Sequence, residues 1–524
     1  MTKPSNISHK VSRRAILKSG AAATTLAMLP LWAGRAEAAC GTLRAGITGY
    51  NVINTLDPAQ TTLIPESYVV WGVFNCLLKF DESMNIVPDL AESYESVSPT
   101  ILRFKLREGV KFHDGVEMTS ADVKFTLDRL RDDATASPHQ SKFAPISEIR
   151  TPDAYTVEIE TAEPFAPMLS YLTNTRTGSQ IVPMHLLKDG TPDDFATNPV
   201  GTGPFKLTEY QPGASLTLAK HTEYFEDGLP MVDIVEIPLI AEESAGVTAL
   251  LGGSIDLTST APFADIPDLE NDDRVQVLKA PGTNTRFISV NNAVAPFDDV
   301  HFRRAVSMAF DRQAMVDVVL FGEGRTANGV VPNSISWAAT QDAPAETMMN
   351  PEEALKELAL SKYGAGTEAT VLTWGSGWWK RFAEVFVLQV NQVLGVNFTV
   401  EVSDSGTVYQ RKQAGDFQAS IWGWLGLIDP DEYAYEIYHT NGSRNYEKYS
   451  NPQVDALLEE ARRILDLGPR GELYRQAEAL AIKDCPVLPC FESNVHNLLA
   501  PKVQGFVQRP YSGFGAQLAE VKDC

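Results

Sequence analysis

The sequence predicts an α/β fold in which helices cover a largely parallel sheet. Strand-like and helix-like stretches alternate in the order β-α-β-α-β between residues 368 and 424, and this order is the building unit of such sheets. Residues 101–112 alternate apolar and basic side chains, as a strand with one buried face does. Residues 119–130 carry apolar side chains at helical spacing after Thr119 and Asp122, which are spaced as a capping box.

The β-α-β-α-β unit also predicts where a ligand binds. Its expected strands cover residues 369–374, 396–402 and 416–424, and its expected helices cover 379–395 and 406–415. Parallel sheets covered by helices bind ligands beyond the carboxyl ends of their strands. The loop that contains Trp378 and the segment that follows Trp424 both start at those ends, so we expect both at a cleft.

Two tryptophans share one face of the last expected strand. Side chains alternate between the faces of a strand, so Trp422 and Trp424 lie on the same side, while the opposite side is apolar and packs into the sheet. Two interpretations stay open. The indole rings pack in a core or between domains, or they form part of the wall of a ligand cleft.

The chain begins with an export signal. Arg13 and Arg14 precede a modest apolar run, and the small residues at 36–38 suit a signal peptidase. The run is shorter than the roughly 20 apolar residues that span a bilayer, which disfavours a membrane anchor. A lipid anchor on Cys40 is disfavoured because Glu37 stands where lipoprotein signals usually carry an apolar residue. We expect a twin-arginine signal peptide at residues 1–38, cleaved after about Ala38, and no membrane insertion afterwards.

The composition describes an acidic globular protein. Residues 1–38 hold six Lys or Arg and one acidic residue, so the exported part has a formal charge of −28. Such a charge repels phosphate backbones, and we expect no nucleic-acid partner. Hydrophobic residues make up 44% of the chain and charged residues 21%, which excludes wholesale disorder.

The sequence lacks the usual catalytic and metal-binding signatures. It has no serine-hydrolase elbow, zinc-protease helix, phosphate-binding loop or dinucleotide fingerprint. No two histidines have the i, i+4 spacing of a zinc helix. We therefore expect no cofactor and no metal.

The cysteines are odd in number, so at least one is unpaired within the chain. They are Cys40, Cys76, Cys485, Cys490 and Cys524. A disulfide between Cys485 and Cys490 would close a short loop, and the first and last cysteines can pair only if the mature termini lie together.

A carboxylate pair is the basis of an alternative function, since exported glycosidases need only two suitably spaced acids. Asp429, Asp431 and Glu432 are the candidates. Pro430 between them and the acidity of the whole protein favour a solvated turn, so the hydrolase remains an alternative from a different class.

Six stretches together resemble one family of proteins. They are residues 55–60, 73–95, 102–129, 200–207, 301–312 and 449–461. In order and spacing they are similar to the peptide/nickel family of extracellular solute-binding proteins, family 5, the capture subunits of ABC importers. The resemblance runs from about Thr42 to Val507.

The resemblance implies a two-lobed periplasmic-binding-protein fold, class II and cluster C type, with a hinge of two crossings near residues 285–292 and 489–497. The first lobe would comprise residues 40–75, 200–285 and 492–524, with an additional subdomain at 76–199. The second lobe would comprise residues 286–491.

The resemblance also implies candidate ligand contacts. Peptide-binding members place an aspartate just after the tryptophan of the last strand, where it pairs with the ligand's amino group. Leu427 occupies that place here, so Asp429 would have to replace the missing carboxylate. Lys380 or Arg381 falls where dipeptide-binding members hold the ligand carboxylate, although a solvated helix start also explains both. Further expected contacts are Trp378, Trp422, Trp424, Thr61 and Thr62.

The function implied is capture without covalent chemistry. We expect a monomeric periplasmic protein, not an enzyme, that closes its lobes around a di- or oligopeptide or a peptide-like compound and delivers it to an inner-membrane ABC permease. A metal chelate of the nickel type or an oligosaccharide is the alternative ligand within the same family.

Overall fold

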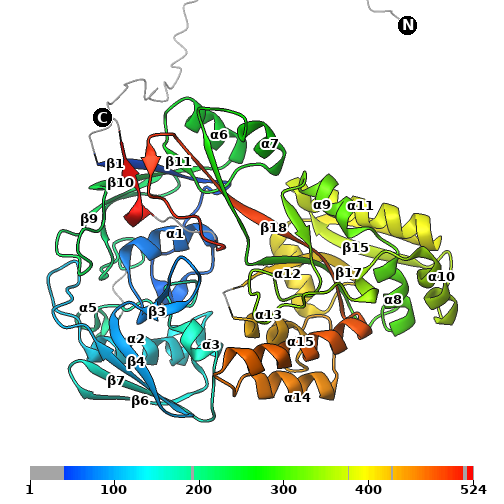
Figure 1. The fold of residues 1–524 in the computed structure, drawn as a ribbon, viewed down its shortest axis with the longest axis horizontal. Helices are drawn as coiled ribbons and strands as arrows, with labels where there is room; N and C mark the ends of the chain where they lie inside the picture. Colours follow the sequence, from blue (N-terminus) through cyan, green and yellow to red (C-terminus); the bar gives the residue numbers. More distant parts are fainter. Residues whose placement is uncertain (1–40, 191–193, 376, 427–428, 512–515, 523–524) are drawn as a thin grey trace, which may run out of the picture. The chain divides into compact units, whose positions relative to one another are not determined.

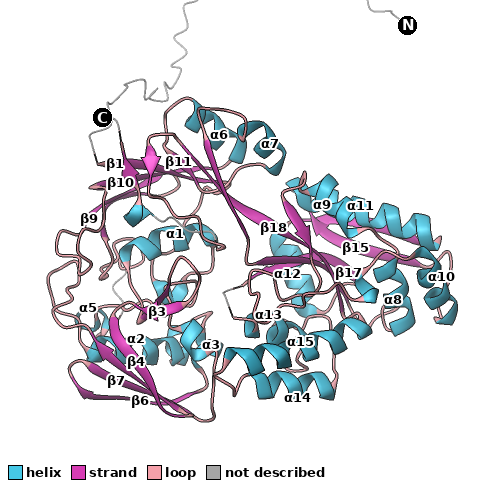
Figure 2. Cartoon of the chain, in the orientation of Figure 1, coloured by secondary structure: helices cyan, strands magenta, loops and turns pink. Residues whose placement is uncertain are grey.

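One sheet of twelve strands runs through two lobes of the protein (Figures 1 and 2). The computed structural model describes residues 41–190, 194–375, 377–426, 429–511 and 516–522. All of these belong to a single compact unit. The main path of the sheet has the strand order β16-β15-β17-β13-β18-β11-β1-β10-β9-β8, and β12 and β14 also pair with β18.

The first lobe holds the β1 end of this sheet. Its strands are β1 (Thr42–Thr48), β8 (Phe205–Gln211), β9 (Ser215–Lys220), β10 (Ile234–Ile240), β11 (Leu257–Thr258) and β12 (Gln276–Pro281). Its helices are α1 (Ile64–Val73), α6 (Glu243–Leu251) and α7 (Ile266–Leu269), and a small hairpin of β19 (Val503–Gln504) and β20 (Glu520–Val521) lies near the end of the chain. β1 pairs in parallel with both β10 and β11.

A subdomain with its own core is inserted after α1. Its antiparallel sheet consists of β4 (Ala91–Ser98), β5 (Ile101–Leu106), β7 (Thr156–Thr161) and β6 (Ile146–Asp153). Its remaining elements are β2 (Leu78–Phe80), β3 (Ile86–Pro88), α2 (Ser120–Arg131), α3 (Gln140–Phe143), α4 (Met168–Tyr171) and α5 (Met184–Leu187). The sequence prediction for this region is confirmed. The apolar residues of β5 are buried, and Thr119 and Asp122 form the capping box of α2.

The second lobe contains the predicted β-α-β-α-β unit. Its strands are β13 (Asn284–Val290), β14 (Gly324–Thr326), β15 (Glu368–Trp374), β16 (Asn397–Ser403) and β17 (Ala419–Leu425). Its helices are α8 (Val300–Met308), α9 (Arg312–Val319), α10 (Pro351–Leu360), α11 (Gly377–Leu394), α12 (Ser405–Ala414), α13 (Asp431–Tyr438), α14 (Pro452–Ala461) and α15 (Leu467–Asp484). β15 is parallel to β16 and β17, which confirms the predicted unit.

The long strand β18 (Val487–Leu499) connects the two halves of the sheet. Its first residues pair with β13 in the second lobe, and its last residues pair with β11 and β12 in the first. The short link between β12 and β13 makes the second crossing. None of the helices in the described part of the chain has the length and apolar character needed to cross a bilayer.

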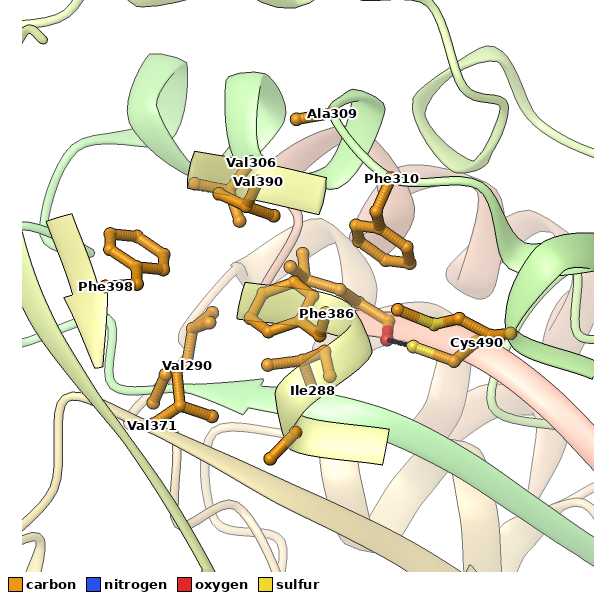
Figure 3. Packing of buried hydrophobic residues seen from close by; sticks show 14 of the residues in the cluster. Ile288, Val290, Val306, Ala309, Phe310, Val371, Phe386, Val390, Phe398 and Cys490 are labelled. Atoms are coloured by element: carbon orange, nitrogen blue, oxygen red, sulfur yellow. Dashed lines mark hydrogen bonds between the residues drawn. The ribbon is translucent and has the colours of Figure 1, made fainter. Parts of the chain in front are cut away.

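The core of the second lobe fixes α11 against the sheet. Figure 3 shows Phe386 and Val390 of α11 packed with Ile288 and Val290 of β13 and Val371 of β15. Because α11 begins at the loop after β15, this packing also positions the first turn of the helix.

A disulfide between Cys485 and Cys490 is not formed. Both thiols are buried and free, as is that of Cys76. Cys485 donates a hydrogen bond to the carbonyl of Ile482 and Cys490 to that of Leu488, so local backbone groups satisfy both sulfurs. Cys40 and Cys524 lie outside the described residues.

Phe386→Ala should lower the free energy of unfolding by about 3–5 kcal/mol, because the ring is fully buried and its removal leaves a cavity. Leu388→Ala on the same helix is the matched control, since that side chain is 67% exposed and its loss should cost less than about 1 kcal/mol. Urea unfolding of both variants measures the difference. Equal losses of unfolding free energy in the two variants would show that the face of α11 that carries Phe386 does not anchor the helix.

Candidate functional site

A cavity of about 380 Å³ lies between the two lobes, next to the crossing strands. The first lobe contributes Tyr50, Ile64, Glu243 and residues 259–264. The second lobe contributes Val319, Phe321, Gly377, Trp378, Arg381 and Leu425, and the crossing region contributes Asn284, Arg286 and residues 493–496. The site is therefore built from three parts of the chain that are far apart in sequence.

The cavity forms where parallel strands end in both lobes. Tyr50, Glu243 and Ser259 follow the carboxyl ends of β1, β10 and β11. In the second lobe, Trp378 follows β15 and Leu425 ends β17. Strand ends of this kind leave room for ligands because the chain must turn away from the sheet there. The predicted location of a site at the ends of β15 and β17 thus coincides with this cavity.

Aromatic rings meet across the cavity. Phe263 of the first lobe makes an edge contact with Trp378 of the second, with 6.4 Å between ring centroids, and also approaches His496 of β18. Trp378 in turn stacks on Trp379 at 4.1 Å. The wall is thus largely apolar, which suits a ligand with hydrophobic surface.

Among the described residues that line the cavity, Arg286 carries the one buried polar side-chain atom without a hydrogen-bond partner. Its guanidinium carbon lies 5.4 Å from the ring centroid of Trp378 and 5.2 Å from that of Trp379. Its Nε is buried without a hydrogen-bond partner, and no described residue forms an ion pair with the guanidinium. Desolvation lowers the pKa of Arg286 to about 10, so the group remains cationic at neutral pH.

Gly423 makes the space that Arg286 occupies. The two residues are directly opposite each other in β13 and β17. A Cβ atom on Gly423 would lie only 2.5 Å from Cδ of Arg286. Any larger residue at position 423 would therefore displace the guanidinium from its place beside the indoles.

The neighbouring polar groups already have partners within the protein. Asn284 donates to the carbonyl of Ser493 at 2.9 Å. His496 and Asn494 both contact the Glu323 carboxylate, at 2.9 and 3.1 Å. These groups shape the cavity, whereas Arg286 is free to receive an anionic group.

Glu243 brings the opposite charge from the first lobe. It accepts a hydrogen bond of 3.0 Å from the hydroxyl of Thr260. Burial raises the pKa of its carboxyl group above the ordinary value. Among the described residues, no group of three or more His, Cys, Asp or Glu side chains gathers in a way that would hold a metal ion.

Comparison with known proteins identifies the family. Residues 85–445 match the model for bacterial extracellular solute-binding proteins, family 5 Middle, which is more than half of the chain. The chain belongs to this family. Its members are solute-binding proteins of transport systems and not enzymes, and they work with ABC permeases.

Curated relatives cover nearly the whole length of this solute-binding protein. Heme-binding protein A of Haemophilus influenzae is 29% identical over 84% of this chain and 85% of its own. Glutathione-binding protein GsiB of Escherichia coli O1:K1 / APEC is 28% identical over 89% and 92%, respectively.

Solved structures share the two-lobed fold. The chain superposes on AgaA of A. tumefaciens R10, solved with agropinic acid, with a TM-score of 0.79 and 26% identity over 92% of this chain and 99% of that one. It superposes on HbpA2 of Haemophilus parasuis with a TM-score of 0.80 and 24% identity over 92% and 100%.

The structure places two of the sequence-predicted contacts at the cavity. Trp378 and Arg381, in the first turn of α11, both line it, and Arg381 lies 5.1 Å from the ring centroid of Phe321. Lys380 is exposed, lies 3.5 Å from Glu384 and is not among the lining residues. Leu427 lies outside the described residues.

The predicted tryptophans of β17 have partners inside the second lobe. The Lys412 ammonium lies 4.4 Å from the ring centroid of Trp422, and the Arg444 guanidinium lies 3.6 Å from that of Trp424. Neither indole lines the cavity described here, although the next residue, Leu425, does. These contacts match the packing interpretation, and a direct ligand contact stays a prediction.

Thr61 and Thr62 are also not among the lining residues. The hydroxyl of Thr61 is buried and donates to the carbonyl of Pro58. The amide of Thr62 donates to Glu66 in α1. Ile64, at the start of that helix, is the nearby residue that reaches the cavity.

The predicted solvated turn at residues 429–432 is wrong. Asp429, Asp431 and Glu432 are all buried. Asp429 forms a bidentate pair with Arg470, at 2.6 and 2.9 Å, which explains why its charge is tolerated away from water. Turning Asp429 toward a ligand would break this pair at a cost of about 3–5 kcal/mol.

These acids also join the second lobe to the subdomain of the first. Asp429 accepts a hydrogen bond from Ser170, Asp431 accepts one from Tyr171, and Glu432 pairs with Lys142. The lobes are thus also in contact through these side chains.

Arg286 and Glu243 are the residues that sequence reasoning missed. Arg286 is the only charged residue in β13, and this isolation was a usable signal. For Glu243 the sequence offers only its position at the start of a helix after a strand.

Asp431→Asn should weaken the pH dependence of stability between pH 7 and 4. Burial raises the pKa of Asp431 from 3.8 to about 6, so the folded state binds a proton more tightly than the unfolded state. Stability linked to this group is therefore gained as pH falls through about 6 and lost as pH rises through it. Urea unfolding should show the wild type gaining about 2 kcal/mol over the variant on acidification.

Asp317→Asn, on the exposed face of α9, is the control and should keep the wild-type pH profile. Identical pH profiles of stability for Asp431→Asn and the wild type would contradict the raised pKa of Asp431.

Proposed function

We propose that this protein captures a peptide-like solute that carries a carboxylate, and that Arg286 receives that group between the closing lobes. The protein would be exported by the twin-arginine route, with its signal removed after about Ala38, and would act in the periplasm as a monomer. It would release the unchanged solute to an inner-membrane ABC permease.

The unpaired charge of Arg286 is the observation that supports this proposal. A half-buried guanidinium whose Nε is enclosed and that has no counter-charge is costly, and the two indoles compensate only part of that cost. A ligand carboxylate would supply the missing charge and a bidentate pair of hydrogen bonds. Binding would therefore favour the closed form, in which the guanidinium is most enclosed.

The names of the relatives agree with an acidic ligand. They include a glutathione-binding, a probable D,D-dipeptide-binding and a heme-binding protein, and a related structure contains agropinic acid. All of these compounds carry carboxyl groups. A carboxylate-bearing, peptide-like solute is the chemistry they have in common.

The remaining predicted contacts belong to the same proposal. Trp378 and Arg381 would contact the ligand from the first turn of α11. Contacts by Lys380, Asp429, Trp422, Trp424, Thr61 and Thr62 would require the ligand to extend beyond the cavity described here, and a contact by Leu427 stays part of the proposal. The domain boundaries given from the sequence, including a subdomain at 76–199 and a second lobe at 286–491, are proposed with it.

Arg286→Gln should weaken binding of the natural solute at least about 30-fold, because a desolvated charge pair contributes 2 kcal/mol or more. The solute is first identified by mass spectrometry of the compound that co-purifies with the exported protein. Calorimetry with that compound then compares wild type and variant.

Lys356→Gln is the matched control, since Lys356 is an exposed cation of α10 that pairs only with Glu353. It should bind as the wild type does. Unchanged affinity in Arg286→Gln, or recovery of a chemically altered solute, would contradict the proposed function.

A further inference from the structure

We propose that the solute is a zwitterion and that Glu243 receives its cationic group from the first lobe. This inference rests on the proposed function and extends it, because it assigns the second charge of the ligand and the direction in which the ligand lies. The carboxylate would face the second lobe at Arg286 and the ammonium group would face the first lobe.

Glu243 is held toward the cavity by its surroundings. It is the first residue of α6, three positions after the end of β10 at Ile240, and lines the cavity together with Thr260. Its Cγ atom packs over Gly49, where an added Cβ would lie 3.3 Å away. Gly49 follows β1 with φ of +80°, a conformation that glycine adopts without strain. A glycine thus makes room for Glu243, just as Gly423 makes room for Arg286.

Glu243 has no cationic partner among the described residues. Its hydrogen bond comes from a neutral hydroxyl, that of Thr260. The second carboxylate of this segment, Glu242, is exposed to solvent and does not line the cavity. A half-buried carboxylate next to this cavity loses hydration when the lobes close, and a cation inside the cavity would compensate that loss while keeping the group ionised.

The two unpaired charges do not neutralise each other. No ion pair joins Glu243 to Arg286, and both line the same cavity together with Tyr50. Burial raises the pKa of Tyr50; the charges of Arg176 and Arg286 lower it, and that of Glu243 raises it. A ligand in this cavity can therefore reach both a cation and an anion.

Asp429 is not available for the same task. Arg470 and Ser170 already occupy its carboxylate oxygens. Glu243 is the one acidic residue among the described residues that line the cavity, and it has no basic partner there. A ligand with both charges gives Arg286 and Glu243 a charged partner at the same time, whereas a simple acid leaves the Glu243 carboxylate desolvated. Zwitterions such as peptides with a free amino terminus should therefore be preferred over acids of the same size.

The test uses a randomised tripeptide library prepared with free ends, with an acetylated amino terminus, and with an amidated carboxyl terminus. Retention by the protein is measured by ultrafiltration and mass spectrometry. The wild type should retain the acetylated library at least about 30-fold less well than the free library. Glu243→Gln should retain these two libraries equally and should still discriminate against the amidated one.

Glu242→Gln is the matched control, because it removes the same charge one residue earlier and should behave as the wild type. The thermal unfolding midpoint of each variant verifies that it folds. Equal retention of free and acetylated peptides by the wild type would overturn the role of Glu243 alone. Equal retention of the amidated library, or retention of none, would overturn the proposed function and this inference with it.

Discussion

The proposed binding site depends on a guanidinium that has no counter-charge in the described part of the protein. Arg286 extends from a sheet strand beside two indole rings and finds no acidic side chain among the described residues. Elsewhere in the second lobe buried charges have an ion-pair or hydrogen-bond partner, as Asp429 has in Arg470 and Arg312 has in the carbonyl of Pro489. The guanidinium of Arg286 has neither among the described residues, and the proposed anion site rests on this difference.

The fold explains why that place lies between the lobes. The sheet continues through both halves, and β18 carries the chain from one to the other. Parallel strands of both halves end at the same cavity, so loops from distant parts of the chain reach one ligand. Closure can bring opposite charges to the two sides of that ligand without covalent chemistry.

Periodicity in the sequence predicts much of this scaffold. The β-α-β-α-β unit and the α2 capping box depend on short spacings, and both are present. Trp378 was predicted because it lies in the loop that follows an expected strand. By contrast, the importance of Arg286 depends on its register against Gly423, which only strand pairing reveals. The buried state of Asp429 likewise depends on Arg470, a partner that lies two helices further along the chain.

The most direct measurement is a crystal structure of the exported protein with the solute that co-purifies with it. The account predicts an acidic group of that solute within about 2.7–2.9 Å of the Arg286 guanidinium. A structure in which Arg286 pairs with an acid of the protein, or in which the acidic group of the solute is bound elsewhere, would contradict it.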